Sequence, residues 1–316
     1  MIDCMRRELR RCGAPRVLTA IVVAVVLGLA VGSSASGQPQ RSAAQPQWLL
    51  FTADPGGLGI EQIFRITLSG TGLKQLTKGP YSAESPAFSP NGKRIAFTRL
   101  GDGIFSMNID GTGLRRLTSN GRDTSPAWSP DGKQIAFLRP TTTAWRVNVM
   151  SASGGGVRRL PQAPAAGRPS WTGRGLVIPT NGDLAKIDPR SGRVQKLFGA
   201  RIDASGGMDT TAVSPDLSKL TFVGPRPPVP GDKGCGEGVP CAVFGLYFQN
   251  LRKHTATRIL ARDTGPATFS PDGQSLAFVT KKHRIVLRLL ANGKTKSIAT
   301  GKITPTTTSP PAWQPR

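Results

Sequence analysis

A repeated segment constrains the fold of this chain more than any other feature of its sequence. Residues 85–99 and 125–139 share eleven of fifteen positions at an offset of 40, and weaker copies occupy 168–178, 211–222, 266–278 and 311–315. In the clearest copies a Ser-Pro-Asp/Asn-Gly stretch separates two apolar stretches. Pro, Asp or Asn, and Gly suit successive positions of a tight turn. Each copy therefore predicts a β-hairpin.

The spacing of the copies predicts a propeller. The apolar residues that precede each turn are separated by 40, 43, 42, 56 and 44 residues, and they are Phe88, Trp128, Trp171, Val213, Phe269 and Trp313. Two further strand-like stretches fit between hairpins, such as 103–109 and 114–118. Four antiparallel strands in about 40 residues make one propeller blade. The 38 Gly and 27 Pro, about a fifth of the chain, suit many short strands joined by turns.

The two ends of the repeat region decide the number of blades. Residues 47–52, 60–66 and 73–76 are predicted second, third and fourth strands that have no first strand before them, and 311–315 is a first strand with nothing after it. Pairing the two ends completes a blade and leaves no exposed sheet edge at the seam. We therefore predict an all-β, six-bladed propeller of four-stranded antiparallel blades over residues 47–316. The long spacing reflects an insertion at 224–242 in blade four.

The first 37 residues have the layout of an export signal peptide. Five Arg precede an apolar run at 17–31, and small residues follow at 32–37. A run of 15 residues is shorter than the about 20 that a membrane-spanning helix needs. We expect cleavage of residues 1–37, a short linker at 38–46, and a periplasmic or extracellular protein. An uncleaved anchor at 17–31 is the alternative.

The repeat resembles a known family. Residues 129–137 read Ser-Pro-Asp-Gly-Lys-Gln-Ile-Ala-Phe, and residues 109–113 read Ile-Asp-Gly-Thr-Gly ahead of Leu117-Thr118. This signature is similar to that of the TolB-like six-bladed propellers, a family of WD40-like Pro-Asp repeats. The resemblance implies a non-catalytic, exported binding or scaffolding platform that docks a partner protein or peptide at the cell envelope.

The sequence offers few groups for catalysis. His254 and His283 are the two histidines, and each is flanked by basic residues. We find no Gly-x-Ser-x-Gly nucleophile motif, no phosphate-binding Gly-rich loop and no Cys-x-x-Cys pair. We therefore assign no catalytic residue, metal or cofactor. A lyase-like or hydrolytic propeller that uses carboxylates such as Glu84 and Asp209 at the channel mouth is the alternative.

The links between blades are the predicted partner face. Four residues before each marker residue, the ring reads Glu84, Thr124, Gly167, Asp209, Gly265 and Ser309, a polar mouth with two carboxylates that suits a cation or a basic peptide. Ordinary solvated turns are the competing interpretation. The residues assigned to this face are Tyr81, Glu84, Arg122, Asp123, Thr124, Arg168, Met208, Asp209, Arg262, Asp263 and Ser309.

The insertion carries the two cysteines that follow the signal. Cys235 and Cys241 are six residues apart. In an oxidising compartment they are expected to form a local disulfide that shapes this loop, with two free thiols as the alternative.

The chain is strongly basic. Its formal charge is +24, and +21 remains without the five Arg and two acidic residues of 1–37. Lys and Arg occur along every blade, and aromatic residues make up 6% of the chain, which is sparse for nucleic-acid stacking platforms. Nucleic acid is therefore disfavoured, while an anionic cell-envelope polymer is a third candidate ligand.

Overall fold

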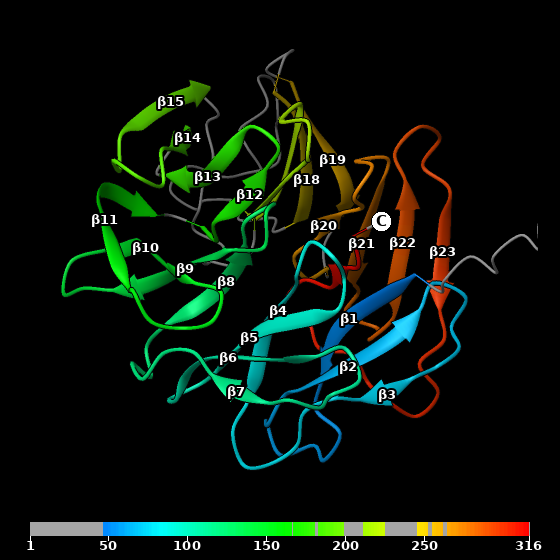
Figure 1. Ribbon diagram of the computed structural model, residues 1–316. Coiled ribbons are helices and arrows are strands. Elements are labelled where there is room, and N and C mark those ends of the chain that lie inside the picture. The colour runs from blue at the N-terminus through cyan, green and yellow to red at the C-terminus, as the bar shows by residue number, and fades with distance from the viewer. Residues whose placement is uncertain are drawn as a thin grey trace, which may run out of the picture. The chain divides into compact units, whose positions relative to one another are not determined.

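The chain forms six small sheets around a common centre (Figure 1). A computed structural model describes residues 47–165, 167–180, 183–198, 211–224, 245–251, 255–261 and 264–315. Within these ranges, each sheet has four antiparallel strands and no helix occurs. The described residues accordingly contain no helix that could span a membrane. The prediction of an all-β, six-bladed propeller is confirmed. The expected signal peptide (1–37), the linker (38–46) and most of the insertion (224–242) lie outside the described residues.

The first three blades follow the chain in order. Blade one is β4 (Ala83–Phe88), β5 (Arg94–Arg99), β6 (Gly103–Asn108) and β7 (Arg115–Arg116). Blade two is β8 (Thr124–Trp128), β9 (Gln134–Pro140), β10 (Trp145–Ser151) and β11 (Arg158–Ala165). Blade three is β12 (Ser170–Thr172), β13 (Gly175–Thr180), β14 (Asp183–Ile187) and β15 (Val194–Phe198).

The remaining blades complete the ring. Blade four is β16 (Thr211–Val213), β17 (Lys219–Gly224), β18 (Gly245–Asn250) and β19 (Thr255–Ala261). Blade five is β20 (Thr268–Phe269), β21 (Ser275–Val279), β22 (Ile285–Leu289) and β23 (Thr295–Ile298). The seam blade is β24 (Ala312–Trp313), β1 (Trp48–Ala53), β2 (Gln62–Thr67) and β3 (Lys74–Gln75), so the two ends of the repeat region share one sheet.

The seam is closed by backbone pairing, as the sequence predicts. Leu49 pairs with Trp313 and Leu50 with Ala312 in antiparallel register. The Gln314 side chain reinforces the closure, because its Oε1 accepts the Trp48 N–H at 3.0 Å and its Nε2 donates to the Gly92 carbonyl at 3.2 Å. Gln314 thus joins the seam blade to blade one.

The turn between the first and second strands of a blade is held by side-chain hydrogen bonds. In blade two, the Ser129 hydroxyl donates to Asp131 Oδ1 at 2.6 Å, and the same carboxylate oxygen accepts the Lys133 N–H at 3.0 Å. Gly132 takes a left-handed φ of 68°, as the turn requires. Blade four keeps the bonds from Ser214 and Ser218 to Asp216 but has Leu217 at φ 57° in place of the glycine.

The core lies between neighbouring blades. Five buried phenylalanines occupy the same position of the second strand in five of the six blades, namely Phe51, Phe97, Phe137, Phe222 and Phe278. Blade three has the smaller Ile178 at this position. Since side chains alternate along a strand, each blade buries apolar groups against both of its neighbours. The ring is therefore stable only as a closed set of packed sheets.

We expect Gln314→Ala to weaken the seam. The substitution leaves the half-buried Trp48 N–H without its acceptor, so the free energy of unfolding should fall by about 1–2 kcal/mol. Chemical denaturation measures this change. Gln274→Ala, at an exposed turn position of blade five, is the matched control and should change stability by less than about 0.5 kcal/mol. Equal effects of the two substitutions would contradict a closing role for Gln314.

The turn carboxylates predict a loss of stability in acid. Hydrogen bonds from Ser129 and Lys133 lower the pKa of Asp131. Burial acts to raise the pKa of Asp216, but hydrogen bonds from Ser214 and Ser218 outweigh it and hold that pKa well below its ordinary value. Because both pKa values are lower in the folded chain, the stabilisation is complete above about pH 4 and is lost as the pH falls through the folded values.

The double variant Asp131→Asn, Asp216→Asn tests this dependence. Asn91 occupies the same turn position in blade one, where its Oδ1 accepts bonds from Ser89 and Lys93, so an amide should keep the turn intact. We expect little change in the melting temperature at neutral pH, and a smaller fall than in the wild type between about pH 4 and pH 2. If the melting temperatures of the variant and the wild type depended on pH in the same way, these carboxylates would not contribute to stability.

Candidate functional site

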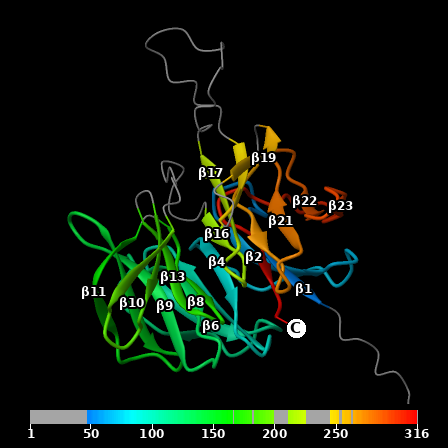
Figure 2. The same ribbon diagram turned by 90° about the horizontal axis from the view of Figure 1, so that it is seen from above.

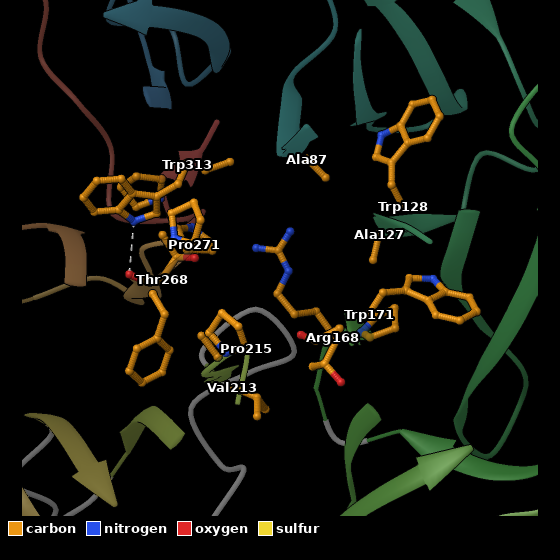
Figure 3. A pocket seen from close by; sticks show the side chains of 18 of the residues that line it. Ala87, Ala127, Trp128, Arg168, Trp171, Val213, Pro215, Thr268, Pro271 and Trp313 are labelled. Carbon is orange, nitrogen blue, oxygen red and sulfur yellow. Dashed lines mark hydrogen bonds between the residues drawn. The ribbon is translucent and has the colours of Figure 1, made fainter. Parts of the chain in front are cut away.

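The first strands of the six blades enclose a central cavity. Its volume is about 300 Å³, and its wall is formed mainly by small and cyclic side chains (Figure 3). Alanine and proline recur at corresponding positions of the innermost strands, namely Ala87, Ala127, Ala212, Ala312, Pro86, Pro126, Pro169 and Pro311. Small side chains suit the place where six strands converge. The repeated Pro-Ala before the marker residue was the sequence signal of this wall.

Arg168 is the charged side chain of this cavity. It precedes β12, is half-buried, and directs its guanidinium into the centre between Ala127 and Pro271 (Figure 3). Among the described residues that line the cavity, no other side chain carries a formal charge. Blades one and two have Ser85 and Ser125 at the corresponding position. The weakest repeat of the sequence therefore supplies a cation to an otherwise uncharged channel.

Aromatic side chains line the cavity beyond the Ala-Pro wall. They are Trp128, Trp171, Phe269 and Trp313, four of the six residues that mark the blades in the sequence. The Trp313 indole N–H is 3.4 Å from the Thr268 carbonyl (Figure 3). The buried indole N–H groups of Trp128 and Trp171 have no hydrogen-bond partner within the described part of the chain. Because these two N–H groups are buried, the aromatic side chains contribute mainly apolar surface to the cavity wall.

The predicted partner face lies where the links enter the innermost strands. Ser85 and Ser125 adopt φ values of 51° and 54°, and the pairing register shifts there in both blades. Ser309, only 2% exposed, accepts the Ser85 N–H at 3.2 Å. Thr98 similarly accepts the Ser125 N–H at 3.1 Å and lies 3.3 Å from the Thr124 hydroxyl. Ser309 and Thr124 therefore stabilise strand entry.

Asp123 lies inside the protein. Its side chain is fully buried and accepts two hydrogen bonds from Arg139, at 2.6 Å from Nε and 2.7 Å from Nη2. The hydrogen bonds to Asp123 raise the pKa of Arg139. A paired and fully buried carboxylate is inaccessible to a partner, so the structure gives Asp123 a part in fixing the entry to blade two. By contrast, the neighbouring Arg122 is exposed.

Tyr81 belongs to an apolar patch on the link face. We use the name link patch for Leu58, Tyr81 and Leu100, which are 78%, 51% and 46% exposed. Ser82 brings their loops together, because its carbonyl accepts the Leu100 N–H at 2.9 Å and its hydroxyl lies 3.5 Å from the Gly59 carbonyl. Glu84, half-buried at the start of β4, is the next predicted residue along the chain. The position of Tyr81 in a link predicts it, whereas Leu58 and Leu100 were not predicted, since single leucines in loops carry no periodic signal.

The other predicted residues cannot be placed. Met208, Asp209, Arg262 and Asp263, together with the cysteines Cys235 and Cys241, lie outside the described residues. The expected carboxylate pair at the mouth and the expected disulfide therefore stay predictions. Within the described ranges, no group of three or more His, Cys, Asp or Glu is arranged to hold a metal ion.

We predict that the Asp123–Arg139 pair stabilises the fold. Arg139→Met keeps much of the side-chain stem but leaves a fully buried carboxylate without its cation, so stability should fall by about 3 kcal/mol. Asp102→Ala is the control, because Asp102 pairs with Arg99 and Arg116 near the surface and such pairs contribute about 0–1 kcal/mol. Denaturant titration of the two variants measures the loss of unfolding free energy in each. Similar losses would mean that burial of Asp123 does not determine the cost.

Comparison with solved structures gives the same fold. TolB from Acinetobacter baumannii superimposes with a TM-score of 0.62 at 17% identity, covering 85% of this chain and 67% of that chain. A chain of the nidogen/laminin complex superimposes with a TM-score of 0.60 at 15% identity, covering 84% of this chain and 98% of that chain. A putative TolB from Agrobacterium tumefaciens superimposes with a TM-score of 0.53 at 15% identity, covering 83% of this chain and 91% of that chain.

Comparison of the sequence with families and with curated proteins adds two findings. No curated protein matches the sequence. The family model of the TolB beta propeller domain matches residues 59–216, half of the chain. With the six-bladed ring and its repeated turn, this match shows that the chain belongs to the TolB β-propeller family.

Proposed function

We propose that this chain is an exported, non-catalytic protein-binding module of the cell envelope. A partner protein or peptide docks on the link face and reaches into the central cavity. The observation that carries the proposal is that Arg168 directs its guanidinium into the central cavity, where no other described lining residue carries a formal charge. Membership of the TolB β-propeller family supports it, as does the fold shared with a chain of the nidogen/laminin complex, which is a protein–protein assembly.

The link patch suits protein recognition. Large exposed apolar side chains that lie together on a surface are typical of docking sites, and tyrosine is enriched among the residues that dominate binding energy. Arg99 lies 5.9 Å from the Tyr81 ring, so a cation accompanies the aromatic side chain. The patch therefore offers apolar anchors beside polar groups that can fix the orientation of a partner.

Arg168 suits an oxygen of the partner. A guanidinium has five N–H donors in a planar arrangement, so it can bind a carboxylate or a backbone carbonyl while keeping hydrogen bonds within its own chain. The surrounding Ala and Pro side chains carry no charge and reduce the screening by water. We infer that the partner inserts an extended segment that carries an acceptor, with Arg168 as its specific contact.

The predicted signal peptide supports export. Without residues 1–37, the chain would begin near the seam blade and consist almost entirely of the propeller. N-terminal sequencing of the protein recovered from its own cells would show whether processing occurs near residue 37.

Site-specific crosslinking tests the docking face. A photoreactive amino acid at position 81 should capture the partner in living cells, and Arg168→Ala should reduce that capture together with the affinity measured for the identified partner. The expected loss of affinity is about tenfold or more, because a hydrogen bond to a charged group contributes about 1.5–3 kcal/mol. Arg174→Ala, an exposed arginine of the same blade, should leave both unchanged.

Two outcomes would contradict the proposal. Capture from position 81 that is insensitive to Arg168→Ala would remove the cavity from the binding site. A turnover that is abolished by Glu84→Ala with Asp209→Ala would support the enzyme alternative instead.

A further inference from the structure

Positive charge is concentrated on blade five. From residue 273 to residue 316 the sequence has no Asp or Glu and eight Lys or Arg. Seven of these lie between residues 281 and 302, and they are Lys281, Lys282, Arg284, Arg288, Lys294, Lys296 and Lys302. One acidic residue of blade five, Asp272, precedes this run, in the turn between β20 and β21. The sequence of blade five is therefore strongly basic.

The outer strands of blade five border a hollow. It has a volume of about 580 Å³ and lies between the turn that joins β21 to β22 and the segment that follows β23. Lys282, His283 and Arg284 form one side of this basic hollow, while Ser297, Thr300, Gly301 and Thr304 contribute to the other. Lys282 and Arg284 are exposed. Two cations thus face a concave surface that also carries the exposed hydroxyls of Ser297 and Thr304, whereas the hydroxyl of the buried Thr300 donates to the Ile303 carbonyl.

The turn that presents these cations is fixed by His283. This residue has a φ of 55°, a left-handed conformation that is unfavourable for a non-glycine residue. Its Nδ1 is 2.9 Å from the Pro305 carbonyl, and since a carbonyl oxygen only accepts, Nδ1 carries the proton. The backbone is held as well, because the His283 N–H donates to Thr280 O at 2.8 Å. The basic side of the hollow is therefore preorganised.

Two lysines near the outer strand lie outside the basic hollow. Lys294 directly precedes β23 and Lys296 lies on it, but both border a different hollow that Asp272 also lines, and the Lys296 ammonium donates to the Leu68 carbonyl at 2.9 Å. The proposed contact is therefore confined to the basic hollow. Figure 1 and Figure 2 place β22 and β23 at the outer rim, on the opposite side of the ring from β10 and β11. This surface is separate from the central cavity.

We propose that the basic hollow of blade five binds the phosphate groups of a linear anionic polymer. Lysine ammonium groups bind phosphate as point charges, and the exposed Ser and Thr hydroxyls can donate to its remaining oxygens. Stacked bases are not required, since no exposed aromatic side chain lies among the described residues of blade five. The proposed ligand is therefore a phosphate polymer whose recognition does not depend on bases. The proposal does not depend on the protein-docking function proposed above.

The experiment uses labelled inorganic polyphosphate of defined length and the complete chain as exported. The triple variant Lys282→Gln, Arg284→Gln, Lys302→Gln removes three exposed cations in or beside the hollow. The control variant Lys93→Gln, Arg115→Gln, Lys133→Gln removes the same charge from exposed positions of blades one and two. Because all six side chains are exposed, both variants should keep the melting temperature of the wild type.

The triple variant of the hollow should bind polyphosphate at least about tenfold more weakly than the wild type. The slope of the logarithm of the binding constant against the logarithm of the salt concentration should also become shallower by about 2, since each lost phosphate contact contributes about 0.7. The control should stay within about threefold of the wild type. Equal losses in the two variants would show that net charge alone governs binding and would overturn the proposal. The proposal would also be overturned if polyglutamate bound as tightly as polyphosphate and lost affinity in the same variant. The site would then lack selectivity for phosphate.

Discussion

The pairing of β24 with β1 is the constraint on which the rest of the ring depends. Leu49 and Phe51 pack toward blade five, while Leu50 and Ile63 pack toward blade one. If the two-residue strand β24 left the seam, both of these faces would lose packing. Ala312 and Trp313 also belong to the cavity wall. The same short contact therefore maintains the hydrophobic core and the candidate binding site.

Most of the fold was predictable because its local and global signals agree. The Ser-Pro-Asp-Gly turn sets the register of each hairpin, and the phenylalanine five residues after the glycine position then faces the core. Blade four shows which part of that signal matters most: Leu217 takes φ 57° while Ser214, Asp216 and Ser218 keep their bonds. The turn is thus specified by the side-chain network, with glycine removing strain rather than creating the turn.

The candidate site was less predictable because it depends on contacts between residues far apart in the sequence. The position of Asp123 in a link predicted that it belongs to the partner face. In the structure its carboxylate is buried and paired with Arg139, which lies sixteen residues further along the chain. Likewise, nothing in the sequence around Arg168 indicates that its side chain enters the channel, since the repeat is weakest there. The link patch depends on three separate loops, which spacing within one repeat cannot bring together.

The distribution of charge matters more for function than its total. At physiological ionic strength, exposed charges interact over about 8 Å, so neighbouring groups decide the local potential. Arg99 and Arg116 share Asp102, and Arg139 is neutralised by Asp123, whereas residues 273–302 carry seven Lys or Arg and no Asp or Glu. A net charge spread over every blade in the sequence therefore becomes a local field on one rim.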